Sequence, residues 1–282
     1  MAKRRYGIDE DKIIRFTKEG RGQGCGPEYR PWLTVQDVSS RGRSSRIHGV
    51  KTGREHHLLS DMETATFLLL DWSNAVTDIR EQFPLERDVT RRIATEMGVR
   101  HPIDSQSQTD VVMTTDFLVN FQTSNGALLL ARSVKPYGEL DNDRTLEKQE
   151  IERRYWEIKK VDWGLITEKD LPAQRIKNLH WLHEMNSLEH MVVPYPGYWE
   201  DRCTRFAACC KQAGDMTIKQ FIHQLEGTQG FSVGEGLMVL RHLVAIKHIV
   251  MNLDAKFDMN APLNVLDIVT SAGVADSARR FA

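Results

Sequence analysis

The Asn125-Gly126 dipeptide, which lies between two apolar runs, is the feature that most constrains the fold of this chain. Both residues tolerate positive φ, so the pair is the strongest two-residue signal for a β-hairpin. Residues 111–119 (VVMTTDFLV) are predicted to form the first strand and residues 127–135 (ALLLARSVK) the returning strand. Pro136 cannot donate a hydrogen bond to the ladder, so we expect it to end the second strand.

The hairpin predicts which side chains meet across it. With Asn125 and Gly126 as the two turn residues, the simplest register places Asp116 directly opposite Lys135, with Cβ atoms roughly 5 Å apart. Ser133 lies on the same face as Lys135 because side chains alternate along a strand. The same pairing also fits an ordinary exposed ion pair, worth at most about 1 kcal/mol.

The segments around the hairpin alternate between helical and strand patterns. Residues 60–63 (SDME) match a capping box and open a helix that runs to about residue 71. Further elements are expected as a strand at 76–82, a short helix near 87–97, a helix from Asp143 or Thr145 to about Lys160, and a strand at 161–167. An apolar stripe on the long helix is formed by Leu146, Ile151, Tyr155 and Ile158. This order predicts an α/β domain with a mixed sheet flanked by helices.

After about residue 170 helical periodicity dominates. We expect helices at 217–225, with Thr217 as a possible cap, and at 232–245, followed by a strand at 247–253 and a loop. This order is that of a winged-helix module, although other small helical domains share it. The sequence thus predicts two domains, residues 1–170 and 171–282.

The net charge of -1 gives no indication of a nucleic-acid partner, but the charge is unevenly distributed. Residues 1–60 hold 13 Lys or Arg against 7 Asp or Glu, a local net charge of +6, which leaves -7 for the rest. This basic N-terminal arm could follow DNA phosphates, although the charge alone slightly favours a solvated terminus. The basic residues best placed to dock on a DNA backbone are Arg41, Arg43, Arg46, Lys51 and Arg54. The glycine-rich residues 20–26 lack a phosphate-binding pattern and predict a flexible turn.

The cysteines favour a reducing compartment. Cys25, Cys203, Cys209 and Cys210 form no CxxC pair, so neither a zinc site nor a disulfide framework is expected. The start of the chain lacks the apolar run of a signal peptide, and the apolar residues 237–251 are interrupted by charges and are too few to span a bilayer. These features predict a cytoplasmic protein.

Three side chains in this arrangement could cut a phosphodiester with a metal. Such hydrolysis requires carboxylates that hold a hard divalent cation and a group that orients water and stabilises charge. Asp116 and Lys135 on the hairpin and Glu63 on the preceding helix supply these groups. Glu63 and a further acid, Glu152 on the long helix, also have ordinary interpretations: Glu63 fits a capping box, and Glu152 fits the solvated face of its helix.

Several long strings resemble the TnsA family of transposon endonucleases. They are KEGRGQG (18–24), PWLTVQ (31–36), KTGREHHLLSDME (51–63), DIREQFPL (78–85), TDFLV (115–119), VKP (134–136) and RTLEKQEIERRYW (144–156). The resemblance covers about residues 12–170 and is weak from 171 to 282. It implies a restriction-endonuclease-like (PD-(D/E)XK) core followed by a winged-helix domain.

The resemblance also implies roles for individual residues. Glu63, Asp116 and Lys135 match the catalytic residues of the family, and Glu152 matches a further family glutamate. Glu63, Asp116 and the Val134 carbonyl would hold one or two magnesium ions, for which manganese could substitute. Ser133 departs from the family, which commonly has a longer acidic or amide residue two positions before the lysine.

The activity implied by the resemblance is the nicking of transposon-end DNA at each 5′ end during cut-and-paste transposition. The expected partners are a TnsB-type transposase and a TnsC-type AAA ATPase, in the bacterial cytoplasm and associated with the nucleoid. Two other functions remain open: an inactive structural subunit that bridges transposase and ATPase, which Ser133 favours, and a winged-helix DNA-binding regulator.

Overall fold

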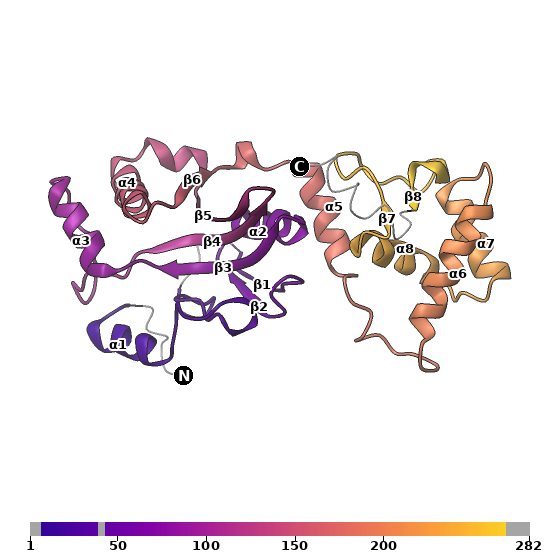
Figure 1. Ribbon diagram of the computed structural model, residues 1–282, viewed down its shortest axis with the longest axis horizontal. Helices are drawn as coiled ribbons and strands as arrows, with labels where there is room; N and C mark the ends of the chain where they lie inside the picture. The colour runs from indigo at the N-terminus through magenta and orange to yellow at the C-terminus, as the bar shows by residue number, and fades with distance from the viewer. Residues whose placement is uncertain (1–6, 39–42, 269–282) are drawn as a thin grey trace. The chain divides into compact units, whose positions relative to one another are not determined.

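The computed structural model describes residues 7–38 and 43–268. The chain divides into two compact units, Met1–Leu171 and Pro172–Ala282. The first unit contains the large sheet, and the second is mostly helical (Figure 1). The mixed α/β class predicted from the sequence is therefore correct.

The main sheet of the first unit has the strand order β3-β4-β5-β6. Its strands are β3 Val76–Pro84, β4 Thr114–Thr123, β5 Gly126–Val134 and β6 Asp162–Ile166. The first three strands are antiparallel, whereas β5 and β6 are parallel, so the sheet is mixed. The parallel pair requires a crossover, which the helix α4 (Asp143–Ile158) provides.

Each face of the sheet is covered by a hydrophobic cluster, because successive side chains of β4 point to opposite faces. Leu118 packs with Ile151 and Trp156 of α4, and α3 (Arg87–Glu96) contributes to the same cluster. Phe117 packs with Phe67 of α2 (Asp61–Trp72) on the other face. The predicted helices at 60–71 and 87–97 are thus confirmed.

The N-terminal segment forms elements that the sequence patterns did not indicate. They are the helix α1 (Glu10–Lys18) and a two-stranded sheet of β1 (Ser45–His48) and β2 (Glu55–Leu58). The glycine-rich residues 20–26 form packed turns rather than a free flexible turn. Gly22 has a φ of 77°, and a Cβ there would lie 2.1 Å from Cγ of Pro84.

The predicted hairpin exists, but its predicted register is wrong. Thr123 pairs with Gly126, so Ser124 and Asn125 form the turn, and the Thr123 hydroxyl accepts a hydrogen bond from the Asn125 N–H. The positive φ falls on Gly126, at 123°, after the turn rather than within it. Since Phe117 pairs with Arg132 in this register, Lys135 is not directly opposite Asp116 and lies just beyond the end of β5.

The predicted apolar stripe of α4 is only half correct. Ile151 and Tyr155 are buried, but Leu146 and Ile158 are 46% and 52% exposed. The helix buries Glu152 instead, at 2% exposure, so the interpretation of this residue as part of a solvated face is wrong. The helix turns a polar side chain toward the sheet.

The C-terminal unit contains four α-helices among its described residues. They are α5 Ala173–His183, α6 Tyr198–Gln212, α7 Ile218–Thr228 and α8 Glu235–Ala245. Thr217 caps α7 in a full capping box with Gln220, which confirms the predicted cap. The predicted strand at 247–253 is shorter, because only β7 (Ile249–Val250) pairs with β8 (Asp267–Ile268).

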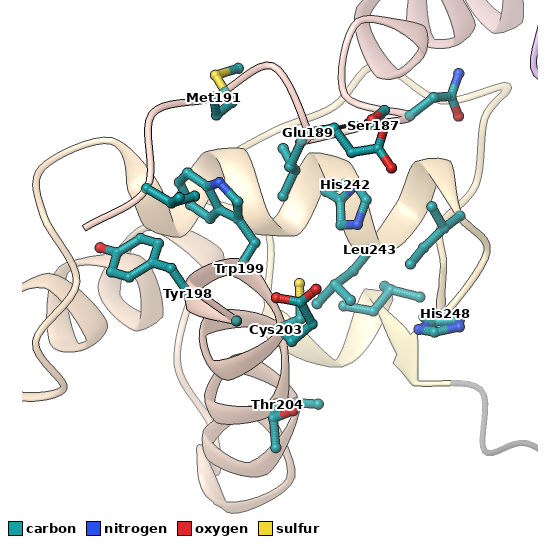
Figure 2. A pocket seen from close by; sticks show the side chains of 18 of the residues that line it. Ser187, Glu189, Met191, Tyr198, Trp199, Cys203, Thr204, His242, Leu243 and His248 are labelled. Carbon is teal, nitrogen blue, oxygen red and sulfur yellow. Dashed lines mark hydrogen bonds between the residues drawn. The ribbon is translucent and has the colours of Figure 1, made fainter. Parts of the chain in front are cut away.

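A hollow of about 1140 Å³ lies within the C-terminal unit (Figure 2). Its lining is largely apolar and comes mainly from α6, which includes Trp199 and Cys203, and from the preceding loop at 186–193. The helix α8 adds His242 and Leu243. Over the described parts of the chain, no helix is long and apolar enough to cross a membrane.

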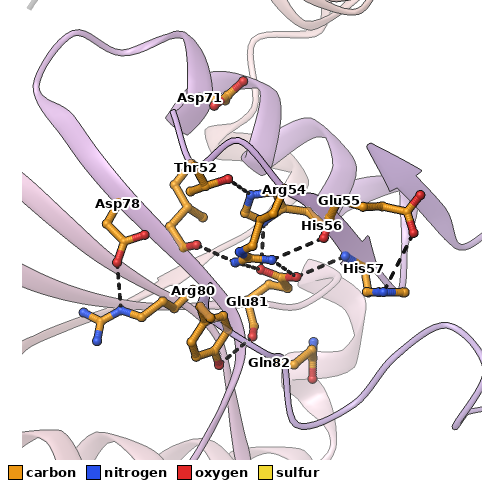
Figure 3. A network of polar contacts seen from close by, with 12 residues as sticks. Thr52, Arg54, Glu55, His56, His57, Asp71, Asp78, Arg80, Glu81 and Gln82 are labelled. Atoms are coloured by element: carbon orange, nitrogen blue, oxygen red, sulfur yellow. Dashed lines mark hydrogen bonds and ion pairs between the residues drawn. The ribbon is translucent and has the colours of Figure 1, made fainter. Parts of the chain in front are cut away.

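A buried ion cluster fixes β2 to β3 in the first unit (Figure 3). Glu81, which is fully buried, accepts hydrogen bonds of 2.8 and 2.6 Å from the Arg54 guanidinium. Its carboxylate also contacts Nδ1 of His56 at 2.7 Å and accepts the His57 backbone N–H. Burial alone would raise the pKa of Glu81, but the hydrogen bonds from Arg54 and His56 outweigh it and hold this pKa at about 2.

The cluster corrects the prediction that Arg54 docks on DNA, because this side chain is buried against Glu81. Arg43 and Arg46 are exposed and pair with acids at the surface. Arg41 lies outside the described residues.

We predict that Arg54→Ala lowers the free energy of unfolding by about 3–5 kcal/mol, because it leaves the Glu81 carboxylate buried without its counter-charge. Urea denaturation followed by circular dichroism measures this loss. Arg46→Ala is the control, since Arg46 pairs with Glu55 at 3.7 Å in an exposed position and its loss should cost less than about 1 kcal/mol. Equal effects of the two substitutions would contradict this account.

Candidate active site in the N-terminal unit

Two carboxylates from different elements converge on one nitrogen atom. Nε2 of Gln82 lies 3.4 Å from Oε2 of Glu63, in the first turn of α2, and 3.3 Å from Oδ1 of Asp116, on β4. Both carboxylates are buried, at 7% exposure each. The helix and the strand therefore direct their acids to a common point.

Lys135 contacts the same group of atoms. Its Nζ lies 3.1 Å from Oδ2 of Asp116 and 2.9 Å from the carbonyl oxygen of Val134. The backbone N–H of Val134 donates to the same Asp116 oxygen at 2.7 Å. Burial disfavours the charged lysine, but the charge of Asp116, its hydrogen bond to Lys135 and the charges of Glu152 and Glu63 together outweigh this effect and raise the pKa of Lys135.

Glu63 both caps its helix and lies in the candidate site. Its N–H donates to the Ser60 hydroxyl, which is one of the two bonds of the predicted capping box, whereas its carboxylate accepts the N–H of Leu59 rather than that of Ser60. Its carboxylate accepts hydrogen bonds from the Leu59 N–H at 2.9 Å and the Ser60 hydroxyl at 3.0 Å. Burial, and then the negative charge of Asp116, raise the pKa of Glu63 to about 7. The capping and site interpretations therefore apply to the same carboxylate.

Glu152 reaches the site from α4 through two hydroxyls. Its Oε1 accepts hydrogen bonds from Ser133 at 2.6 Å and from Thr115 at 2.7 Å, and Thr115 accepts one from the Trp156 indole. Burial, and then the charge of Asp116, raise the pKa of Glu152 to about 7. Ser133 thus connects β5 to a buried acid of α4.

Gln82 is the residue of this site that the sequence patterns did not indicate. In the strand predicted at 76–82, Gln82 is only the last residue and has no special role. It is 2% exposed and has a φ of 49°, a backbone conformation that a non-glycine residue rarely adopts. The sequence carries no local signal for that conformation.

The donor set suits a hard divalent cation. Glu63 and Asp116 offer carboxylate oxygens that face a common point, and the Val134 carbonyl oxygen lies beside Lys135. In the described parts of the chain no group of three or more His, Cys, Asp or Glu side chains could hold a metal ion. Two carboxylates and one carbonyl fit an ion that completes its shell with water.

Two carboxylates and a lysine at the end of a sheet are an arrangement suited to metal-assisted phosphodiester hydrolysis. Residues 73–168 match the family described as "TnsA-like endonuclease N terminal", and residues 170–253 match "TnsA endonuclease C terminal". The chain is 41% identical over 260 residues to the transposon Tn7 transposition protein TnsA of Escherichia coli, which covers 92% of each chain. It belongs to the TnsA endonuclease family.

The raised pKa of Glu152 predicts a pH-dependent stability in metal-free protein. A Glu whose pKa rises from 4.5 to about 7 on folding contributes stability below pH 4.5 and loses it as the pH rises through 7. Glu152→Gln stays neutral and can still accept the Ser133 and Thr115 hydroxyls. We expect the free energy of unfolding of this variant to exceed that of the wild type by roughly 1–3 kcal/mol above pH 7 and to equal it near pH 4.5.

Urea denaturation in the presence of a chelator, at several pH values, checks this expectation. Glu150→Gln is the control on the same helix, because hydrogen bonds from Arg153 lower the pKa of Glu150 to about 2. The free energy of unfolding of Glu150→Gln should not exceed that of the wild type at high pH. A Glu152→Gln variant that is less stable than the wild type at pH 8 would show that the carboxylate is not strained there.

Proposed function

We propose that this chain is the magnesium-dependent endonuclease that nicks the 5′ ends of a transposon during cut-and-paste transposition. The observation that carries the proposal is the convergence of Glu63, Asp116 and Lys135 at one end of the sheet. The membership of the TnsA endonuclease family supports it.

Glu63, Asp116 and the Val134 carbonyl would hold the divalent ion, for which manganese could substitute. When bound, the ion supplies Lewis acidity to the scissile phosphate and acidifies water. Lys135, held by Asp116, orients the attacking water and stabilises the negative charge that develops on the phosphate. Water oxygen forms the new bond to phosphorus as the bond to the 3′ oxygen breaks, which leaves a 3′ hydroxyl and a 5′ phosphate.

We assign the N-terminal unit to the restriction-endonuclease-like (PD-(D/E)XK) class and the C-terminal unit to the winged-helix class. The mixed sheet with acids from α2 and β4 supports the first assignment. The order of α7, α8 and the paired strands β7 and β8 supports the second.

The proposed partners are transposon-end DNA, a TnsB-type transposase and a TnsC-type AAA ATPase. The relative from Escherichia coli is named a Tn7 transposition protein, and this chain aligns with it over 92% of its length. We place the assembly in the bacterial cytoplasm, associated with the nucleoid.

We predict that Asp116→Ala and Lys135→Ala each reduce 5′-end nicking by at least about 100-fold, because the first removes a ligand of the divalent ion and the second removes the ammonium that stabilises charge at the scissile phosphate. Strand-specific cleavage of a transposon-end substrate by the reconstituted complex measures the effect. Asp88→Ala is a suitable control, because this carboxylate on α3 is 95% exposed. Full nicking by the Asp116→Ala complex would refute the assignment.

The two other functions make different predictions. An inactive structural subunit would bind neither Mg²⁺ nor Mn²⁺ at Glu63 and Asp116, which isothermal titration detects. A DNA-binding regulator would bind specific DNA tightly as an isolated chain and without a metal. The convergence of two acids and a lysine favours the endonuclease over both.

A further inference from the structure

We propose that Gln82 is a positioning residue that holds Glu63 and Asp116 on one point in the metal-free protein, ready for the divalent ion. The inference deepens the proposed function and rests on it. It concerns the amide side chain and not the chemistry of the ion.

The amide of Gln82 makes three directed contacts. Its nitrogen donates to Oε2 of Glu63 at 3.4 Å and to Oδ1 of Asp116 at 3.3 Å. Its oxygen accepts the Thr114 hydroxyl at 3.0 Å, which fixes the orientation of the amide. An amide nitrogen carries two hydrogens, so one donor is available for each carboxylate.

The backbone at this position is held in a conformation that aims the side chain at the site. Gln82 has a φ of 49°, which costs a non-glycine residue of order 1 kcal/mol and persists only where the surroundings impose it. The carbonyl of Gln82 accepts the Trp32 N–H at 3.2 Å, and the preceding Glu81 is fixed by Arg54. The strand pairing resumes at Phe83, which pairs with Thr115.

This amide has a specific task because the two carboxylates are close and buried. Like charges in such a place repel each other. Leu59 and Ser60 hold Glu63, and Val134 and Lys135 hold Asp116, but none of these four residues contacts both acids. Gln82 offers a hydrogen to both at once, so they stay directed at the same point. A cation that binds beside the amide meets two carboxylates already directed at one point, and the amide keeps its hydrogen bonds because each carboxylate has further lone pairs left for the ion.

The test measures Mn²⁺ affinity of the full chain by isothermal titration for the wild type, Gln82→Met and Gln82→Gly. Methionine keeps the length of the side chain without its donors, and glycine adopts the positive φ without strain. We expect both variants to bind Mn²⁺ about tenfold more weakly, the loss that corresponds to one charge-assisted hydrogen bond.

Gln108 provides matched controls. It also has a positive φ, of 57°, but it is exposed and its amide donates to the Ser105 carbonyl. Gln108→Met and Gln108→Gly should bind Mn²⁺ as the wild type does. Unchanged or tighter binding by both Gln82 variants would overturn the proposal. An effect of Gln82→Met without one of Gln82→Gly would also overturn it, because packing or strain would then be the cause.

A second measurement separates this inference from the metal site itself. In metal-free protein the side-chain ¹H–¹⁵N signals of Gln82, assigned by their absence in Gln82→Met, should exchange slowly with solvent. If the wild type binds no Mn²⁺, the metal-dependent function fails, and slow exchange still supports the bridging amide. Fast exchange of these hydrogens shows that the amide does not bridge the carboxylates and overturns the inference.

Discussion

Where the backbone pairing of β4 and β5 ends, the side chain of Asp116 accepts the next hydrogen bond from β5. The last backbone pair is Phe117 with Arg132, and beyond it the Val134 N–H donates to the Asp116 carboxylate. The same oxygen accepts the Lys135 ammonium. One carboxylate therefore satisfies a buried N–H, whose loss would cost about 1–3 kcal/mol, and fixes the lysine of the site. The end of the sheet and the site are stabilised by the same interaction.

The charges around this carboxylate are unbalanced. Glu63, Asp116 and Glu152 come from α2, β4 and α4 and surround one lysine. Burial and mutual repulsion raise the pKa values of Glu63 and Glu152 to about 7, so the metal-free protein holds these acids at a cost. The ion pair between Glu81 and Arg54 fixes β3 directly before Gln82, and this stabilisation offsets the repulsion. A divalent cation would relieve the repulsion, and this is what makes the arrangement suited to binding one.

Local signals in the sequence predicted local structure well. Ser60 and Thr217 cap the helices expected from them, because a cap depends only on the adjacent turn. The hairpin was predicted, but not its register, because the glycine takes its positive φ after the turn. Asp116 and Lys135 meet despite that error, since a lysine side chain is long enough to reach back over the two residues by which the register differs.

The parts of the site that depend on distant contacts could not be predicted. Glu152 can be buried because the hydroxyls of Thr115 and Ser133, on two strands, donate hydrogen bonds to it. The backbone of Gln82 depends on Trp32, fifty residues earlier in the chain.

The most direct test of the central claim is the anomalous difference map of a crystal grown with Mn²⁺. The account predicts a peak bounded by Glu63, Asp116 and the Val134 carbonyl, and a peak elsewhere with none between these groups would contradict it.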